Sequence, residues 1–439
     1  MKKVAILLII LAIGVGGFYA YTQFATQSIV VIDKTDGEVS EIKINLNVKD
    51  NKKEEIKKEE PVEQPKEEIK PVEDIKEIDS GDVAVPKKVY SEFDILKYMS
   101  NERNYMISPF SLKMALMMTA NGATGETQEE MLESFGIEDI SAYNQKAEEL
   151  INRYNSAEDV KLNVANSIWL NKDIALNTVF SEEFKTLVAN YYKGEANEVT
   201  SEDAVIKINT WVEEKTNGKI KDLLDDPMFI SALINTLYFK GEWANQFDTV
   251  LTEKEMFTDI NGVEIEKEFM NKTNRFSYFE DDTMQIIKMP YKDFKTAMYI
   301  AIPKKDNLEL DFDNAINNMS SKKVNVTIPK FKVEYSITLN DILKQMGIKK
   351  AFGGQAEFVK MFTTNSVDNF YISQVLQKTY IDVDENGTEA AAATAVILKA
   401  TSARPQPEEI IDFVANKPFT YFIRDDESGE VLFLGEILY

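Results

Sequence analysis

The spacing of apolar residues along this chain favours helices early and strands later. Helical spacing marks residues 90–99, 109–119 and 180–192. Continuous or alternating apolar runs, typical of strands, occupy residues 162–170, 232–243, 276–303, 329–335 and 371–383. Because both element types occur in mixed order and strands dominate the second half, the pattern predicts an α+β fold.

Turn residues place two of the helix boundaries. Ser108 precedes Pro109, a pair typical of a helix cap followed by the first helical turn, and residues 121–123 (Asn-Gly-Ala) end that helix. A shorter helix is predicted over residues 339–347, with Gly347 as its stop.

The first 27 residues have the pattern of an export segment. A short basic head, Met1–Lys3, precedes an apolar stretch, Val4–Tyr21, that is longer than most cleaved signals and slightly short of a full membrane span. Positions near Ala20 and Ala25 make poor cleavage sites, which favours an uncleaved anchor with the lysines inside. A cleaved signal peptide is the alternative, and both interpretations predict an extracellular protein.

Residues 28–83 separate this segment from the folded domain. Apolar alternation around Asp36-Gly37 predicts a small hairpin within residues 28–48. Residues 49–82 are crowded with Lys and Glu and are interrupted by Pro61, Pro65 and Pro71, a composition that predicts an extended, solvated linker. The domain itself is expected over residues 84–439.

Composition removes several function classes. A formal net charge of −24 over 439 residues argues against nucleic acid as a partner, because binding phosphates requires basic surface. The chain has no cysteine and no histidine, which excludes disulfides, thiolate clusters, the usual general base and Ser-His-Asp catalysis. No Walker-type phosphate loop and no distinctive carboxylate pair occurs. We therefore expect neither an enzyme nor a protein with a cofactor or a bound metal.

The segment from Asp384 to Val396 has an unusual pattern. Gly387 can adopt positive φ without steric cost, and mostly small residues follow it, including four consecutive alanines at 390–393. Small or apolar residues stand at every second position from Thr388 to Ala400, whereas Glu389 and Lys399 have the other parity. This segment could lie outside as a loop or enter a sheet as a strand with its small face inward and its charges outward.

A calcium loop is the first functional interpretation of this segment to reject. The spacing Asp382-x-Asp384-x-Asn386-Gly387 matches the opening of such a loop, but its twelfth position, where a bidentate Glu is required, is Ala393.

Several ordered blocks instead resemble the serpin family of protease inhibitors. The segment 382–394 resembles the hinge of a serpin reactive loop, and residues 416–419 and 429–435 resemble the family's closing signature and last hairpin. Further matching blocks are residues 104–112, 208–220, 232–243, 247–257 and 375–378. The resemblance covers residues 84–439 and implies the serpin fold, with large mixed β-sheets, surrounding helices and an exposed reactive-centre loop.

The resemblance implies irreversible inhibition of serine proteases. A protease cleaves the loop and forms its acyl-enzyme, the loop enters the main sheet as a new strand, and the distorted protease is trapped. The hinge residues that this implies are Glu385, Gly387, Thr388, Glu389, Ala390, Ala391, Ala392, Ala393 and Thr394. Non-inhibitory serpins often carry proline or bulky charged residues there, so the small residues favour inhibition over the alternative, a non-inhibitory binding module.

Carrying over the family spacing places the scissile bond between Thr401 and Ser402. Cleavage after Ala400 is a close alternative, and Lys399 is a trypsin-like option; Pro405 would obstruct cleavage after Arg404. The small residues at the bond imply a serine protease with a shallow primary pocket, elastase-like or subtilisin-like. The stretch from Ser402 to Asn416 is longer than in common family members. We expect a monomer, tethered to the membrane if the anchor is retained.

The resemblance also implies a gate beneath the sheet. Ser108, Ser111 and Asn235 match the family's shutter cluster, which a histidine usually completes; here Gln377 takes that place. We call Ser108, Ser111, Asn235 and Gln377 the shutter cluster. A glutamine amide donates and accepts hydrogen bonds but cannot become charged, so we predict that gating lacks the pH dependence of a histidine.

Overall fold

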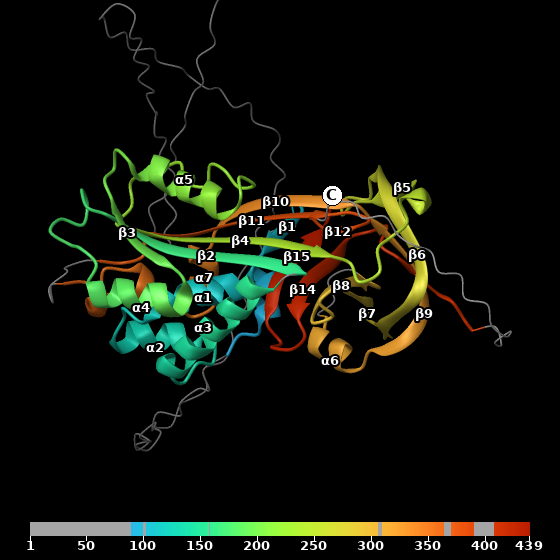
Figure 1. Ribbon diagram of the computed structural model, residues 1–439, viewed down its shortest axis with the longest axis horizontal. Coiled ribbons are helices and arrows are strands. Elements are labelled where there is room, and N and C mark those ends of the chain that lie inside the picture. Colours follow the sequence, from blue (N-terminus) through green and yellow to red (C-terminus); the bar gives the residue numbers. More distant parts are fainter. Residues whose placement is uncertain (1–88, 100–101, 158, 306–309, 364–369, 390–407) are drawn as a thin grey trace, which may run out of the picture. The chain divides into compact units, whose positions relative to one another are not determined.

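The computed structural model describes residues 89–99, 102–157, 159–305, 310–363, 370–389 and 408–439 (Figure 1). Several predictions fall outside these ranges: the export segment, the hairpin and linker, the boundary at residue 84, hinge residues Ala390–Thr394 and the Thr401–Ser402 bond. Among the described residues, no helix is long and apolar enough to span a membrane.

A six-stranded sheet carries the hinge. Its spatial order is β10, β11, β12, β4, β2, β3. In that order the strands span Phe331–Thr338, Gln374–Val383, Gly387–Thr388, Ser231–Glu242, Val160–Asn171 and Glu195–Val199. The predicted strands at 162–170, 232–243 and 371–383 are thereby confirmed.

The two central strands of this sheet are paired at one end and separated at the other. β11 and β4 are parallel and pair directly over seven positions, from Gln374 with Ala232 to Tyr380 with Tyr238. Beyond that point β12 lies between them, antiparallel to both, with Thr388 paired to Val383 on one side and to Gly241 on the other. The sheet is therefore partly open where the hinge enters it.

The other described strands form a nine-stranded sheet with the order β1, β15, β14, β8, β7, β6, β9, β13, and β5 pairs with β6. In chain order its strands are β1 (Tyr105–Ile107), β5 (Glu253–Thr258), β6 (Glu264–Glu280), β7 (Met284–Pro290), β8 (Thr296–Pro303), β9 (Ser320–Pro329), β13 (Ile411–Val414), β14 (Phe419–Asp425) and β15 (Val431–Ile437). Its last strand pair, β14–β15, is the predicted closing hairpin. β13 pairs in parallel with β9 and is the first described strand after the reactive-loop region.

Helices cover both faces of the six-stranded sheet (Figure 1). On one face lie α1 (Pro109–Ala120), α2 (Gly125–Glu133), α3 (Ile140–Ser156) and α4 (Glu182–Tyr192). On the other lies α5 (Ala204–Lys215), whose Ile208, Trp211 and Val212 form a separate apolar core with residues of β2 and β4. The short helices are α6 (Phe312–Asn317) and α7 (Asn340–Gln345), with 3-10 helices η1 (Glu92–Tyr98), η2 (Thr249–Leu251), η3 (Lys350–Phe352) and η4 (Val359–Met361).

The predicted helix boundaries largely hold. Ser108 is the N-cap of α1, and its side-chain oxygen accepts the backbone N–H of Ser111 at 3.1 Å, with Pro109 in the first turn. The expected first amphipathic helix at residues 90–99 is instead the 3-10 helix η1. A capping box between Ser91 and Asp94 marks its start. With only 7 residues the segment is too short for several α-helical turns.

A charged cluster fixes η1 and α1 to the turn between β14 and β15. Lys113 of α1 contacts Glu92 Oε1 at 2.8 Å and Glu430 Oε2 at 2.5 Å, and Lys146 of α3 contacts Glu430 Oε1 at 3.0 Å. We call these four residues the ionic joint. Burial would raise the pKa of Glu430, but the two ammonium groups outweigh it and lower that pKa to about 2.

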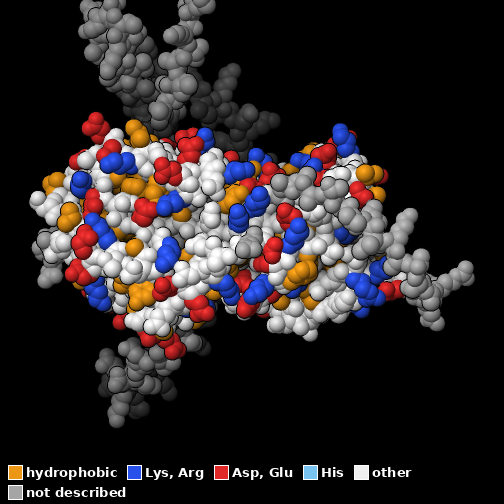
Figure 2. Space-filling model, in the orientation of Figure 1, with side chains coloured by type: hydrophobic (Ala, Val, Ile, Leu, Met, Phe, Trp, Pro, Cys, Tyr) orange, Lys and Arg blue, Asp and Glu red, His pale blue; other side chains and the backbone are white. Residues whose placement is uncertain are grey.

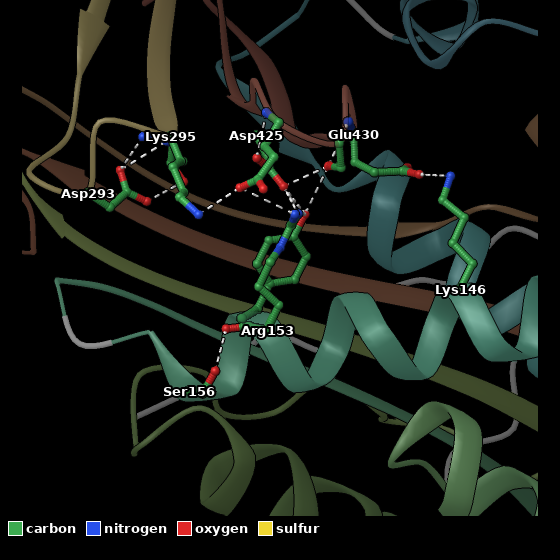
Figure 3. A network of polar contacts seen from close by, with 11 residues as sticks. Lys146, Arg153, Ser156, Asp293, Lys295, Asp425 and Glu430 are labelled. Atoms are coloured by element: carbon green, nitrogen blue, oxygen red, sulfur yellow. Dashed lines mark hydrogen bonds and ion pairs between the residues drawn. The ribbon is translucent and has the colours of Figure 1, made fainter.

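Further along α3, the same turn is held by a second set of contacts (Figure 3). Arg153 pairs with Asp425, and the Tyr154 hydroxyl donates to the same carboxylate at 2.8 Å. On the far side of the turn, Lys295 pairs with Glu427 at 2.8 Å. These contacts make the region where α3 meets the β14–β15 turn a fixed part of the fold.

Candidate functional site

Gly387 enters the sheet where no side chain fits. Its φ is +154°, and a Cβ atom there would collide with the carbonyl oxygen of Gly241 and the Cα of Glu242. A glycine is therefore required for β12 to approach β4 this closely. The sequence predicted glycine as the pivot, and the contact with Gly241 supplies the physical reason.

An Asx turn shapes the chain just before the pivot. Asp384 Oδ1 accepts the backbone N–H groups of Asn386 at 2.7 Å and Gly387 at 3.2 Å. Trp243, the residue after β4, holds this turn: its indole N–H donates to the Asp384 carbonyl at 2.9 Å and its backbone N–H donates to the Asn386 carbonyl at 2.9 Å. The Asp-x-Asn-Gly spacing that mimics a calcium loop thus forms a turn. Within the described residues, no group of three or more acidic side chains is placed to hold a metal ion.

Thr388 is the first residue whose side chain lies inside the sheet. It is fully buried, and its hydroxyl lies 2.8 Å from the hydroxyl of Tyr291. The Tyr291 ring stacks on Trp243 with a centroid separation of 4.7 Å. The predicted inward parity of Thr388 is confirmed, and only a small side chain fits this position.

Glu385 ties the hinge to two neighbouring segments. Its carboxylate accepts the Thr252 hydroxyl at 2.8 Å and pairs with Lys330 at 3.4 Å, and its carbonyl accepts the Phe247 N–H at 2.9 Å. Burial opposes ionisation, but a backbone hydrogen bond, Thr252 and Lys330 together keep the pKa of Glu385 below its ordinary value.

Glu389 has the predicted opposite parity, but its side chain does not face open solvent. Only 6% of the side chain is exposed, and it pairs with Lys219 at 3.3 Å. Lys219 lies in the segment between α5 and β4, which covers this face of the sheet. The prediction that Glu389 lies on the face of the sheet opposite to Thr388 is correct, but the prediction that its side chain is exposed to solvent is wrong. The backbone also takes a left-handed φ of +52°, unusual for glutamate.

The structure brings the four residues of the shutter cluster together, all fully buried. Gln377 of β11 bridges to the start of α1: its side-chain oxygen accepts the Ser108 N–H at 2.8 Å, and its amide donates to the Ser108 carbonyl at 3.1 Å. The same amide donates to the side-chain oxygen of Asn235 in β4. Gln377 and Asn235 are paired positions of the two strands, so this bond crosses the junction that insertion would open.

Asn166 of β2 extends the cluster and was not predicted. The Asn235 side-chain amide donates both to Ser111 Oγ and to Asn166 Oδ1. Asn166 stands directly opposite Asn235 in the β2–β4 pair, and its own amide nitrogen is buried without a hydrogen-bond partner in the described part of the chain. The signal in the sequence was weak, since Asn166 is one of two asparagines in the predicted strand 162–170 and lies 69 residues before its partner.

Comparison with known proteins assigns the family. A family model described as serpin (serine protease inhibitor) matches residues 91–439. The chain belongs to the serpin family. Serpins are generally inhibitors rather than catalysts and act on serine proteases as partners, although some members are non-inhibitory.

Relatives of this serpin come from distant lineages. An uncharacterised serpin-like protein of Thermococcus kodakarensis is 36% identical over 365 residues, covering 79% of this chain and 83% of that protein. Serpin-Z10 of Arabidopsis thaliana is 31% identical over 370 residues, covering 78% and 94%. The solved structure of the thermophilic serpin tengpin in its native state is similar with a TM-score of 0.72 and 31% identity, covering 79% and 92%.

A further solved structure is similar in fold alone. Human thyroxine-binding globulin, complexed with its hormone, has a TM-score of 0.71 at 23% identity, covering 79% of this serpin and 95% of that chain. The serpin fold therefore also occurs in a hormone-binding protein, and the activity of this serpin must be argued from its own hinge.

Proposed function

We propose that this serpin is an irreversible suicide inhibitor of serine proteases. The proposal rests on the position of Thr388, which is buried between β11 and β4. A longer inserted strand would continue from Thr388 between the same two strands. A chain that continued past Thr388 would replace the direct β11–β4 pairing with a ladder on both sides. Cleavage of the loop frees it to make that change, and the added strand stabilises the product.

The sequence after Thr388 suits this insertion. Ala390, Ala392 and Thr394 have the parity of Thr388 and are small, so they fit an interior that accepts no large side chain at Thr388. In the proposed mechanism, cleavage between Thr401 and Ser402 leaves the protease as an acyl-enzyme on Thr401, and insertion carries it along the sheet. The small residue at the bond favours elastase-like or subtilisin-like proteases.

We also propose that the protein acts outside the cell as a monomer. Residues 1–27 would serve as a signal peptide or as an anchor, and residues 28–83 would then form the link to the serpin domain. In the anchored form the inhibitor would work at the outer face of the membrane.

The test is a covalent complex that survives boiling in detergent. The full chain is incubated separately with pancreatic elastase, subtilisin and trypsin, and the products are resolved by gel and mass spectrometry. We expect an adduct with elastase or subtilisin and a released fragment beginning at Ser402. A fragment that begins at another residue would place the scissile bond before that residue. Loop cleavage without any adduct favours the non-inhibitory alternative.

A further inference from the structure

A cavity of about 280 Å³ lies beside the hinge, outside the insertion path. Its walls come from the segment after β4, from β6 and from the end of β7, and the turn between β7 and β8 closes one side. The apolar part of the lining includes Trp243, Phe247 and Met289. Nothing in the inhibitory mechanism uses this space.

Phe294 occupies the left-handed position of that turn, where its backbone N–H donates to the Tyr291 carbonyl at 3.0 Å. Its φ is +55°, a left-handed value that glycine or asparagine adopts at low cost and that is an outlier for a bulky aromatic residue. Its ring lines the cavity, yet the residue is 72% exposed. An aromatic side chain that is held under strain and left largely in water points to a function at this position.

Two cations line the cavity, Arg275 of β6 and Lys288 of β7. Lys288 is already paired with Asp426 at 2.5 Å, which leaves Arg275 as the group that can receive an anion. Arg275 pairs with Glu408 at 2.6 Å, but both side chains are about half exposed, so this contact contributes little and can be exchanged. A guanidinium group binds a carboxylate through two parallel hydrogen bonds, and the aromatic walls suit a flat ring.

We propose that this cavity binds a small aromatic carboxylate, with the ring between Phe294 and the Trp243 wall and the carboxylate on Arg275 in place of Glu408. The volume is close to the lower limit for small-molecule sites and admits one or two fused rings. The binding claim does not depend on protease inhibition.

The cavity wall is connected to both ends of the reactive-loop region. Trp243 stacks on Tyr291, whose hydroxyl contacts Thr388, and the Trp243 indole donates to Asp384. Glu408, the residue that the ligand would displace from Arg275, lies on the other side of the loop, three residues before β13. A ligand that binds this arrangement more tightly than the inserted one would slow loop insertion.

Isothermal titration calorimetry on the full chain tests the proposal, with indole-3-acetate as the probe and indole-3-acetamide as its uncharged counterpart. We expect a Kd between roughly 10 µM and 1 mM for the acid and binding at least about fivefold weaker for the amide, since a charged hydrogen bond is lost. Equal affinity for acid and amide would overturn the carboxylate class, and no heat with either probe at millimolar concentration would overturn the site.

Variants locate the binding. Phe294→Gly relieves the strained φ, so the protein should remain folded with an unchanged or higher Tm while affinity for the acid falls about tenfold or more. Arg275→Gln should weaken the acid and leave the amide unchanged. Lys323→Gln is the matched control, because Lys323 is the cross-strand neighbour of Arg275 and does not line the cavity. Equal affinity in all three variants would place the probe elsewhere and overturn the proposal.

Discussion

Two polar clusters contact the first part of helix α1, between Ser108 and Lys113, and one of them is charged while the other is not. At its start, Ser108 and Ser111 join Gln377, Asn235 and Asn166 in a cluster built only from hydroxyls and amides. One turn later, Lys113 joins Glu92, Glu430 and Lys146 in the ionic joint. The shutter cluster is fully buried, whereas the ionic joint has a largely buried centre, Lys113 and Glu430, and a half-exposed Lys146. Both clusters hold distant parts of the chain together.

The difference in charge corresponds to whether the segments that each cluster joins stay together or must separate. The ionic joint fixes η1 and the β14–β15 turn to α1, surfaces that stay together, and an ion pair opened in a dry interior leaves a charge without a partner. The shutter cluster crosses the β11–β4 junction, which must open for insertion. Amides both donate and accept, so Gln377 and Asn235, which lie on the two strands that part, can re-form hydrogen bonds with an arriving strand. Charge is absent where the strands must part.

Placing a charge on the insertion path should have the largest effect. Thr388→Arg puts a guanidinium group at a fully buried position beside Tyr291. Because Thr388 already lies between β11 and β4 before cleavage, the guanidinium group should displace β12 from the sheet. Insertion would then have to bring a desolvated charge back, so the arm should enter too slowly to trap the acyl-enzyme, and the protein should become a substrate. We expect at least a tenfold rise in the stoichiometry of inhibition, measured with whichever protease forms the adduct.

Thr388→Ser is the matched control, since it keeps the hydroxyl and the small volume. It should trap at close to the original stoichiometry. Trapping by Thr388→Arg at the original stoichiometry would show that an uncharged path is not needed.

Breaking the ionic joint should cost stability without affecting inhibition. Lys113→Met leaves the buried carboxylates of Glu92 and Glu430 facing each other, and removing one partner of a buried ion pair costs about 3 kcal/mol of unfolding free energy. Urea unfolding measures the loss. Lys146→Met, which removes a half-exposed partner, should cost less than about 1 kcal/mol.

The joint also predicts the direction of acid unfolding. Because the two ammonium groups lower the pKa of Glu430 in the folded protein, its contribution is present above its ordinary pKa of 4.5 and is lost as the pH falls below that value. Burial raises the pKa of the neighbouring Glu92, which offsets part of this loss. Lys113→Met should flatten this part of the stability profile. A change in inhibition stoichiometry in Lys113→Met would contradict the separation between a fixed joint and a moving path.

Removing one amide from the shutter cluster should have a smaller effect on stability. Gln377→Leu fills a similar volume but leaves the buried N–H of Ser108 and the side-chain oxygen of Asn235 without their partner. The expected cost is about 2 kcal/mol, and it falls on the bond that joins β11 to β4. Conversion to an inserted or polymeric form on mild heating should accelerate, as native gels would measure. A rate no faster than that of the original protein would mean that the cluster does not gate the junction.

The sequence predicted the parts of this site that depend on one residue's own chemistry. Glycine at 387, a small Thr388 and a capping Ser108 each follow from local backbone or packing rules. Asn166 and Lys219 were missed because their roles depend on which strand and which connecting segment lie against them, 69 residues from Asn235 in one case. The α+β class could be predicted from apolar spacing, but the nine-stranded sheet could not, since its pairs join segments far apart in the chain.

The smallest predicted effect is an absence of pH dependence. Gln377 does not titrate, and neither of the residues that its side chain contacts by hydrogen bonds among the described residues, Ser108 and Asn235, titrates. The rate of insertion should therefore change by less than about twofold between pH 8 and pH 5, because this cluster contains no ionisable group.

The variant Gln377→His supplies the contrast. A neutral imidazole can accept the Ser108 N–H and donate to Asn235, whereas protonation removes the acceptor and leaves a buried charge, so the folded-state pKa of this histidine should lie below its ordinary value. Its stabilising contribution is then present above about pH 6.5 and is lost as the pH falls below it. Insertion in Gln377→His should accelerate at pH 5 relative to pH 8, and an equally large acceleration in the original protein would show that a group outside the shutter cluster controls the gate.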